Sequence, residues 1–206
     1  MILQMLDNLK EMLIDRNDTA DNFENINIDN FTKPVPVIIY EKNTCVIIAL
    51  SSAAKKVVID QLKPVSNKKL KETDEEIDVF KEFVTNHNKY FNYVVVFEEL
   101  TTADNKLLVK FDKILNKMDG LLSVFMFADL HFNPTKHYLV DKHTKLTKEE
   151  IKVLMTKYSI KTKIALPIIL KSDPIAKWLG IRPGDIVKID RYNPNSGLID
   201  YYRSCV

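Results

Sequence analysis

Short apolar runs separated by helical patterns constrain the fold of the first two-thirds of this 206-residue chain. The runs occupy residues 35–40, 44–50, 93–97 and 121–127. Runs of this length with almost no polar interruption are typical of strands that are covered on both faces. Amphipathic helical patterns lie between or beside them, at residues 51–62, 75–86 and 103–117. Strands that alternate with helices predict an α/β unit with a largely parallel sheet.

The segment before the first strand predicts a helix followed by a loop. Apolar residues recur at helical spacing in residues 1–16, beginning with Ile2, Leu6 and Leu9. We expect this helix to pack on its own domain, because binding at a membrane surface needs a basic polar face that it does not have. Residues 17–30 are acidic and rich in Asn, which predicts a loop. No apolar run reaches the roughly 18 residues of a membrane span, and the mixed charges of the first residues are unlike a signal peptide.

A capping box marks the start of a helix in the last third of the chain. The hydroxyl of Thr147 is placed to accept a hydrogen bond from the amide of Glu150, whose carboxylate is placed to accept one in return. Leu146 and Ile151 stand at the two positions of a hydrophobic staple. This pattern predicts a helix that ends near Tyr158.

A second, short helix and a turn are predicted further along. Asp173 suits the N-cap, Pro174 the first helical position and Gly180 the left-handed position after the helix. Pro183 and Gly184 suit the central positions of a type II turn. We therefore expect a helix that is defined at both ends and a tight turn soon after it.

The chain is predicted to end in a hairpin and to divide into two domains. Strands are expected at residues 186–191 and 198–204, joined by a polar loop. Residues 131–136 have the composition of a linker. We therefore expect an N-terminal α/β domain at residues 1–133 and a small C-terminal mixed α/β domain at residues 134–206.

Charge is divided unevenly between these two parts of the chain. The whole chain has 30 basic and 28 acidic side chains, a net charge of +2. Residues 1–136 have a net charge of −4 and residues 137–206 a net charge of +6. The near-balance argues against a strongly basic nucleic-acid coat protein, and the change of sign indicates two units with different neighbours.

The sequence lacks the motifs of the common catalytic and cofactor-binding sites. It has 4 glycines and contains no Gly-rich phosphate loop, dinucleotide-binding fingerprint or nucleophile elbow. Cys45 and Cys205 make no disulfide framework, so free thiols in a reducing, intracellular compartment are expected. His131, His137 and His143 have a spacing that does not place them on one helix face, and no thiol or carboxylate completes a metal site. We expect no cofactor, no metal and no small-molecule substrate.

Acidic residues near strand ends leave an enzymatic alternative open. Asp104 and Lys106 match the Asp/Glu-x-Lys triplet of metal-dependent nucleases, in which carboxylates hold a cation that activates water. The triplet lies in a polar turn after a strand and not within a strand, so nuclease activity is not expected. Glu98 and Glu99 form a carboxylate pair, for which a solvated strand end is the simpler interpretation.

A cluster of lysines is the candidate for contacts with phosphate groups. It consists of Lys68, Lys69 and Lys71. An acidic run follows at residues 72–78 and weakens the local positive field, so a solvated loop is the simpler interpretation. These three lysines are kept as candidate DNA-facing residues.

A longer series of residues in the last third forms one pattern. It consists of His137, Leu139, Val140, His143, Leu146, Leu166, Pro167, Ile169, Asp173, Pro174, Leu179, Gly180, Gly184, Asp185, Val187, Lys188, Ile189, Arg191, Gly197, Tyr202 and Arg203. In order and spacing, over about 70 residues, the series closely resembles the small shared subunit of cellular RNA polymerases. This is the fifth-largest subunit common to the three eukaryotic enzymes, and its archaeal counterpart consists essentially of this C-terminal domain.

The chain departs from that family pattern in two places. Asp141 stands where the family has Pro, and Asn193, Asn195 and Ser196 replace its usual Ser, Thr and small residue before Gly197. Asn and Ser also favour turns, so we expect the hairpin to be retained.

The resemblance implies a non-catalytic structural subunit of a multisubunit DNA-dependent RNA polymerase. Residues 134–206 would form an assembly domain that docks on the largest subunit among the other polymerase subunits. Residues 1–133 would form a nuclease-like α/β jaw domain, without nuclease activity, near downstream DNA that it contacts weakly or indirectly. Nucleotide addition would belong to the large subunits. A free-standing transcription or nucleic-acid-binding factor with the same C-terminal domain is the alternative.

The resemblance also nominates residues that define the interface or the fold. They are His137, Leu139, His143, Pro167, Asp173, Pro174, Gly180, Gly184, Asp185, Arg191, Gly197, Tyr202 and Arg203. His137 and His143 are expected to hold the start of the C-terminal domain through hydrogen bonds.

The composition also leads to an expectation about the source. The chain has 26 Lys against 4 Arg and is rich in Asn and Ile, which is typical of an AT-rich genome. We expect a viral homologue from a large DNA virus that transcribes in the host cytoplasm, where the protein would also enter the virion. A cellular eukaryotic copy would be nuclear.

Overall fold

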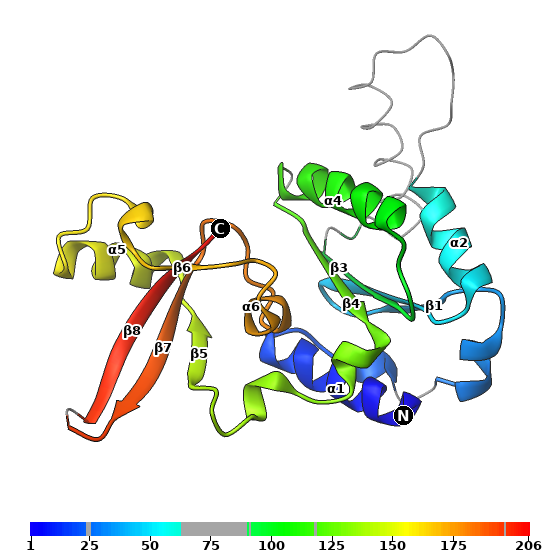
Figure 1. The fold of residues 1–206 in the computed structure, drawn as a ribbon, viewed down its shortest axis with the longest axis horizontal. Coiled ribbons are helices and arrows are strands. Elements are labelled where there is room, and N and C mark those ends of the chain that lie inside the picture. Colours follow the sequence, from blue (N-terminus) through cyan, green and yellow to red (C-terminus); the bar gives the residue numbers. More distant parts are fainter. Residues whose placement is uncertain (24–25, 63–89, 91, 118, 196) are drawn as a thin grey trace, which may run out of the picture. The chain divides into compact units, whose positions relative to one another are not determined.

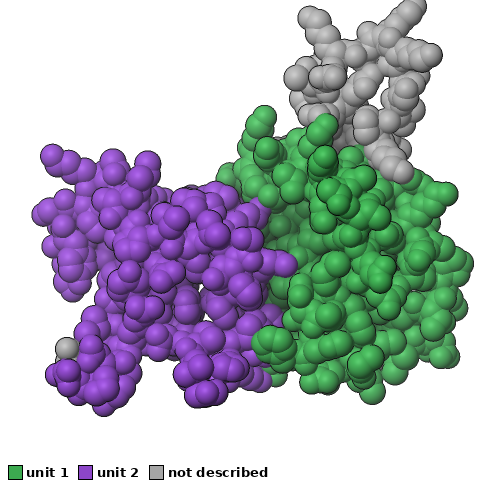
Figure 2. Space-filling model, in the orientation of Figure 1, with its two compact units in different colours: residues 1–132 green, residues 133–206 purple. Residues whose placement is uncertain are grey.

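The protein forms two compact units in a computed structural model that describes residues 1–23, 26–62, 90, 92–117, 119–195 and 197–206. Unit 1 is residues 1–132 and unit 2 is residues 133–206 (Figures 1 and 2). The helix expected at residues 75–86 and the lysine cluster Lys68, Lys69 and Lys71 lie outside the described residues. No helix in the described ranges has the length and apolar character that crossing a membrane requires.

Unit 1 contains a four-stranded, largely parallel sheet, as predicted. The strands are β1 (Val37–Tyr40), β2 (Thr44–Ala49), β3 (Asn92–Phe97) and β4 (Leu121–Met126), in the order β1-β2-β3-β4. β2, β3 and β4 are parallel, and β1 is antiparallel to β2. The continuous apolar runs of β2 and β3 are buried along almost their whole length. Burial on both faces explains why these strands do not alternate polar with apolar residues.

Helices cover both faces of this sheet (Figure 1). α1 (Ile2–Asp15) lies on one face, and α2 (Ser52–Gln61) and α4 (Thr102–Lys117) lie on the other. The hydroxyl of Ser51 caps α2 by accepting a hydrogen bond from the amide of Ala54 (3.1 Å). All three helices therefore begin and end close to where the apolar periodicity predicted them.

The segment expected to be a loop at residues 17–30 contains two short 3₁₀ helices. These are Asp21–Phe23 and Ile28–Thr32. Buried Glu41 accepts hydrogen bonds from the hydroxyl of Thr19 (2.7 Å) and the amide of Asn22 (2.9 Å). Polar composition predicted irregular structure here, but a remote carboxylate orders the segment.

Unit 2 is a second mixed sheet built around a long hairpin. Its strands are β5 (Lys142–Lys145), β6 (Ile168–Ile169), β7 (Ile186–Asn193) and β8 (Gly197–Cys205), in the order β5-β7-β8-β6. β7 pairs antiparallel with β8 and with β5, whereas β6 pairs parallel with β8. The hairpin was predicted, but both of its strands are longer than the sequence pattern indicated.

One helix packs on each face of the hairpin. Ile186 joins Leu146, Ile151 and Leu154, so α5 (Lys148–Lys157) covers one face. Its neighbour Val187 points the opposite way and joins a second cluster, formed by Ile169, Ala176, Ile181, Ile189 and Cys205. That cluster includes Ala176 of α6 (Pro174–Trp178), which covers the other face. The period of two along a strand thus separates the two cores.

The predicted capping box of α5 is confirmed. The hydroxyl of Thr147 accepts a hydrogen bond from the amide of Glu150 (3.3 Å), and the Glu150 carboxylate accepts one from the amide of Thr147 (2.7 Å). Leu146 and Ile151 lie in one apolar cluster, as a hydrophobic staple requires.

The predicted ends of α6 are confirmed as well. The Asp173 carboxylate accepts a hydrogen bond from the amide of Ile175 (2.9 Å), and Pro174 is the first helical residue. Gly180 has φ +62°, and its amide donates to the carbonyl of Lys177 (3.3 Å). The amide of Ile181 donates to the carbonyl of Ala176 (2.9 Å), which completes a Schellman motif.

We predict that Thr147→Ala lowers the free energy of unfolding of unit 2 by about 1 kcal/mol, because an N-cap is lost. Trp178 is the chain's one tryptophan and is buried in unit 2, so its fluorescence in a denaturant titration reports on this unit. The matched control is Thr162→Ala, since the exposed Thr162 precedes a 3₁₀ turn without capping it. Equal stability of the two variants would contradict the prediction.

Candidate assembly surface

All the residues nominated as interface or fold-defining lie in unit 2.

Two of these residues form the turn between α6 and β7. Gly184 has φ +87°, and the amide of Asp185 donates to the carbonyl of Arg182 (3.0 Å), which is the predicted type II geometry. The Asp185 carboxylate accepts hydrogen bonds from the amide of Arg182 (2.8 Å) and from Lys145 Nζ (2.6 Å). These contacts give Gly184 and Asp185 a structural role in the turn.

The same turn is joined to the end of β8. The amide of Gly184 donates to the carbonyl of Cys205, and the amide of Cys205 donates to the carbonyl of Asp185, both at 2.9 Å. On the other side of the strand, the amide of Ser204 donates to the carbonyl of Pro167 (2.8 Å). Pro167 is exposed, so its backbone supports the fold while its ring faces outward.

Two nominated arginines lie on either side of one ring on the α6 face of the sheet. The guanidinium of Arg191 lies over the ring of Tyr201 (4.7 Å from Cζ to the ring centroid), and that of Arg203 lies 5.7 Å from the same centroid. Arg191 Nε also lies 3.5 Å from a carboxylate oxygen of Asp141. Asp141 thus adds an ion pair to this face. Arg203 Nη1 lies 3.5 Å from the carbonyl of Ile168.

Tyr202 lies on the opposite, α5 face. Its ring lies 6.1 Å from that of Tyr158, and its hydroxyl lies 3.4 Å from the Asp200 carboxylate. Lys188 bridges Asp190 (3.1 Å) and Asp200 (2.9 Å). Hydrogen bonds to Asp200 and Asp190 raise the pKa of Lys188, and the bond from Lys188 lowers the pKa of Asp200. This face therefore carries a charged network beside an aromatic pair.

The nominated histidines make local contacts at the start of unit 2. The amide of Leu139 donates to His137 Nδ1 (3.3 Å), and the His137 ring stacks on that of Tyr138. His143 Nδ1 lies 2.6 Å from the carbonyl of Asp141. Within the described ranges, no group of His, Cys, Asp and Glu has the arrangement of a metal site.

Apart from Leu139, the exposed apolar side chains of unit 2 were missed by the residue motifs. Tyr138 is 86% exposed, Ile164 87%, Tyr192 73% and Leu198 69%. Others on the same unit are Leu139, Val153, Tyr158, Ile168, Leu170, Ile199 and Val206. Tyr192 and Leu198 are partners across the hairpin. Pairing the two predicted strands would therefore have placed these apolar side chains next to each other.

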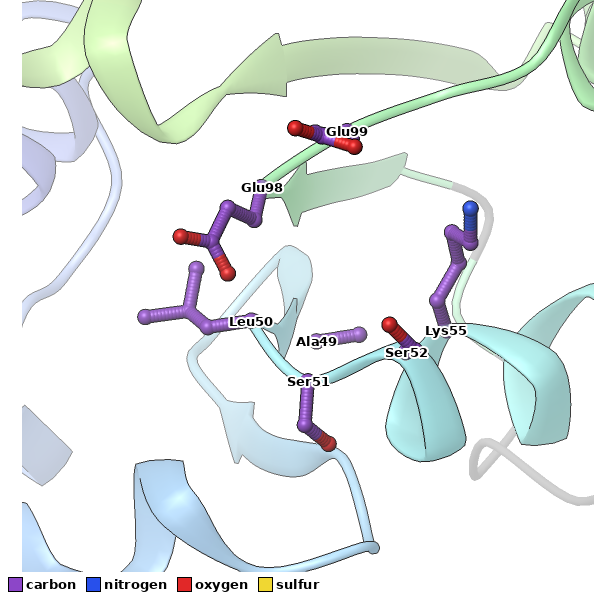
Figure 3. A pocket seen from close by; sticks show the side chains of 7 residues that line it. All are labelled: Ala49, Leu50, Ser51, Ser52, Lys55, Glu98 and Glu99. Atoms are coloured by element: carbon purple, nitrogen blue, oxygen red, sulfur yellow. The ribbon is translucent and has the colours of Figure 1, made fainter.

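The carboxylate pair Glu98 and Glu99 borders a depression of about 290 Å³ at the carboxyl ends of β2 and β3. It is lined by Ala49, Leu50, Ser51, Ser52, Lys55, Glu98 and Glu99. Figure 3 shows Glu98 and Lys55 on opposite sides of it, so their side chains do not converge on one point.

The nuclease-like triplet has a structural role at the start of α4. The carboxylate of Asp104 accepts a hydrogen bond from the amide of Thr101 (3.1 Å), and the hydroxyl of Thr101 accepts one from the amide of Asp104 (3.2 Å). Lys55 lies 3.6 Å from the same carboxylate. Burial favours a higher pKa for Asp104, but the Thr101 hydrogen bonds and Lys55 lower it below its usual value. Asp104 thus stabilises a helix N-terminus.

Both cysteines are free and buried, as expected for structural thiols. Burial raises the pKa of Cys45 to about 12, so its thiol is protonated at neutral pH. Burial also raises the pKa of Cys205. The depression, the triplet and the thiols therefore add no recognisable reaction centre to the described part of unit 1 or unit 2.

The similarity to known proteins is concentrated in unit 2. Residues 132–205 match the family described as RNA polymerase Rpb5, C-terminal domain. DNA-directed RNA polymerase subunit Rpo5 of Pyrococcus horikoshii is 49% identical over 75 residues, which are 36% of this chain and 90% of that protein. The chain belongs to the Rpo5/Rpb5 family of RNA polymerase subunits.

A longer match comes from Dictyostelium discoideum, whose DNA-directed RNA polymerases I, II, and III subunit rpabc1 is 37% identical over 113 residues. These are 55% of each chain. Since unit 2 has only 74 residues, this similarity includes part of unit 1. The relatives are named as polymerase subunits, so the Rpo5/Rpb5 assignment favours the subunit function over a free-standing factor.

We predict that Gly184→Ala destabilises unit 2 by about 1 kcal/mol, because the residue must keep a positive φ. A Cβ at this position meets no atom within 4 Å, so the cost is conformational and not steric. Gly184→Asn is the matched control and should cost less, because Asn adopts the left-handed region more readily. Trp178 fluorescence during denaturant unfolding measures both, and equal losses would contradict this account of the turn.

Proposed function

We propose that this protein is a non-catalytic structural subunit of a multisubunit DNA-dependent RNA polymerase and that unit 2 docks on the largest subunit. The observation that carries the proposal is the coincidence of the family match with unit 2. The matched residues 132–205 are nearly those of the compact unit 133–206, which also holds every nominated residue.

The surface of unit 2 supports an assembly role. A unit of 74 residues exposes many large apolar side chains, among them Tyr138, Ile164, Tyr192 and Leu198. Tyr192 and Leu198 are neighbours across the hairpin, and contiguous exposed apolar side chains are typical of surfaces that a partner covers. The net charge of +6 over residues 137–206 favours an acidic partner surface.

Unit 1 is proposed to be the jaw of a two-domain, eukaryotic-type subunit, near downstream DNA. The similarity to the Dictyostelium subunit extends beyond unit 2 and supports the two-domain type. Because residues 1–136 have a net charge of −4, any contact of unit 1 with DNA needs a local cluster of basic residues. Lys68, Lys69 and Lys71 are the candidates for this cluster.

The proposed source is a large DNA virus, with the protein in the host cytoplasm and the virion; a cellular copy would act in the nucleus. The support is the composition, with 26 Lys against 4 Arg.

Affinity purification of the tagged full chain from its native source tests the proposal. We expect the polymerase large subunits to co-purify in stoichiometric amounts. The fragment 133–206 should be sufficient for this association, whereas the fragment 1–132 should lose it, with circular dichroism as the check that both fragments fold. Recovery of the full chain without other polymerase subunits would contradict the proposed function.

We also predict that the isolated full chain binds duplex DNA with an affinity weaker than about 1 μM at physiological salt, because its larger part is acidic. Fluorescence anisotropy with a labelled 25-base-pair duplex measures this across a range of salt concentrations. Binding tighter than that limit, with a steep dependence on salt, would show that the chain engages DNA by itself.

A further inference from the structure

The outer edge of β8 is open along most of its length. β7 pairs with β8 from Gly197 to Ser204, whereas β6 pairs only with Ser204 and Cys205. The amide of Ser204 donates to Pro167 and that of Val206 to Ile169, so even-numbered residues direct their backbone groups away from β7. By the same alternation, the N–H and C=O groups of Asp200 and Tyr202 face the outer edge. No backbone partner for them exists in the described ranges.

This edge has two charged residues, Asp200 and Arg203, but lacks two other features that protect an edge strand, a proline and a short length. Residues 197–205 contain no proline, and β8 is one of the two longest strands of the described chain. Leu198 is 69% exposed and Ile199 41% exposed, and Ile168 at the start of β6 is 55% exposed. A long, partly apolar strand with unpaired backbone groups is a template for another strand.

The α6 face beside this edge is basic. Arg203 lies on β8 itself, and its Nε is buried with no hydrogen-bond partner in the described part of the chain. Arg191 lies on the same face, and the Tyr201 ring lies between the two guanidinium groups. A carboxylate arriving along the outer edge meets Arg203 first, because Arg191 lies beyond the Tyr201 ring and is already paired with Asp141. A buried N–H of a cation without a partner favours such an acceptor.

We propose that residues 198–203 accept an extended segment of another polymerase subunit as an added β-strand, and that this segment places an acidic side chain against Arg203 on the α6 face. The added strand would supply backbone partners to Asp200 and Tyr202 and cover Leu198 and Ile199. The inference rests on the proposed function, because it specifies how unit 2 binds a partner subunit.

A proline at the edge tests the backbone pairing. Asp200→Pro removes the outward N–H that an added strand needs, and proline is tolerated where the N–H of an edge strand faces solvent. Asp200→Ala is the matched control, since it also removes the carboxylate that binds Lys188 but keeps the N–H. With the polymerase reconstituted from its other subunits, we expect Asp200→Pro to weaken incorporation of the full chain at least tenfold and Asp200→Ala less than twofold.

A charge substitution tests the acidic partner. Arg203→Gln should weaken incorporation at least threefold and reduce its dependence on salt. Lys152→Gln on the exposed side of α5 removes one positive charge elsewhere and should leave incorporation unchanged. Equal effects of the two substitutions would overturn the assignment of an acidic side chain to Arg203.

Amide hydrogen exchange of the unmodified chain keeps the test independent of the folding of any variant. The amides of Asp200 and Tyr202 should exchange at least tenfold more slowly in the polymerase than in the free chain. Unchanged exchange within an assembled polymerase would overturn the added strand and leave the proposed function intact. Failure of the unmodified chain to assemble at all would instead contradict the proposed function, and the added strand with it.

Discussion

The antiparallel pairing of β7 with β8 is the interaction on which the rest of unit 2 depends. It directs Ile186 and Val187 to opposite faces, and these two side chains join two separate apolar clusters. α5 completes one cluster and α6 completes the other, so neither helix has a core without the hairpin. The edge strands β5 and β6 are short and pair with only part of it. The distal part of the hairpin therefore extends beyond both edge strands (Figure 1), and it carries the exposed side chains of Tyr192 and Leu198.

Local signals in the sequence predicted much of this unit. Asp173 and Gly180 act within one turn of the helix that they delimit, and Thr147 acts on an amide three residues away, so their roles follow from local geometry. The pairing of β6 with β8 could not be predicted in this way. Ile168 and Ile169 are too few for a periodic pattern, and their partners Ser204 and Cys205 lie more than thirty residues further along the chain.

The same distinction applies to the candidate surface. The arrangement of Arg191, Tyr201 and Arg203 depends on the register between β7 and β8. Predicting a hairpin from the sequence does not fix this register to within one residue. A shift of one residue would move Tyr201 to the α5 face. In unit 1, burial of Glu41 and its hydrogen bonds to Thr19 and Asn22 order a segment whose composition indicated only a loop. Long-range hydrogen bonds of this kind leave no local pattern.

The central claim is that this chain is an integral subunit of a polymerase and is not a separate factor. The most direct measurement is native mass spectrometry of the polymerase purified through a tag on its largest subunit. The account predicts one copy of this 23.9 kDa chain in every intact enzyme, and loss of that mass only when the complex dissociates. An intact, active enzyme whose measured mass is fully explained by its other subunits, without this chain, would contradict the account.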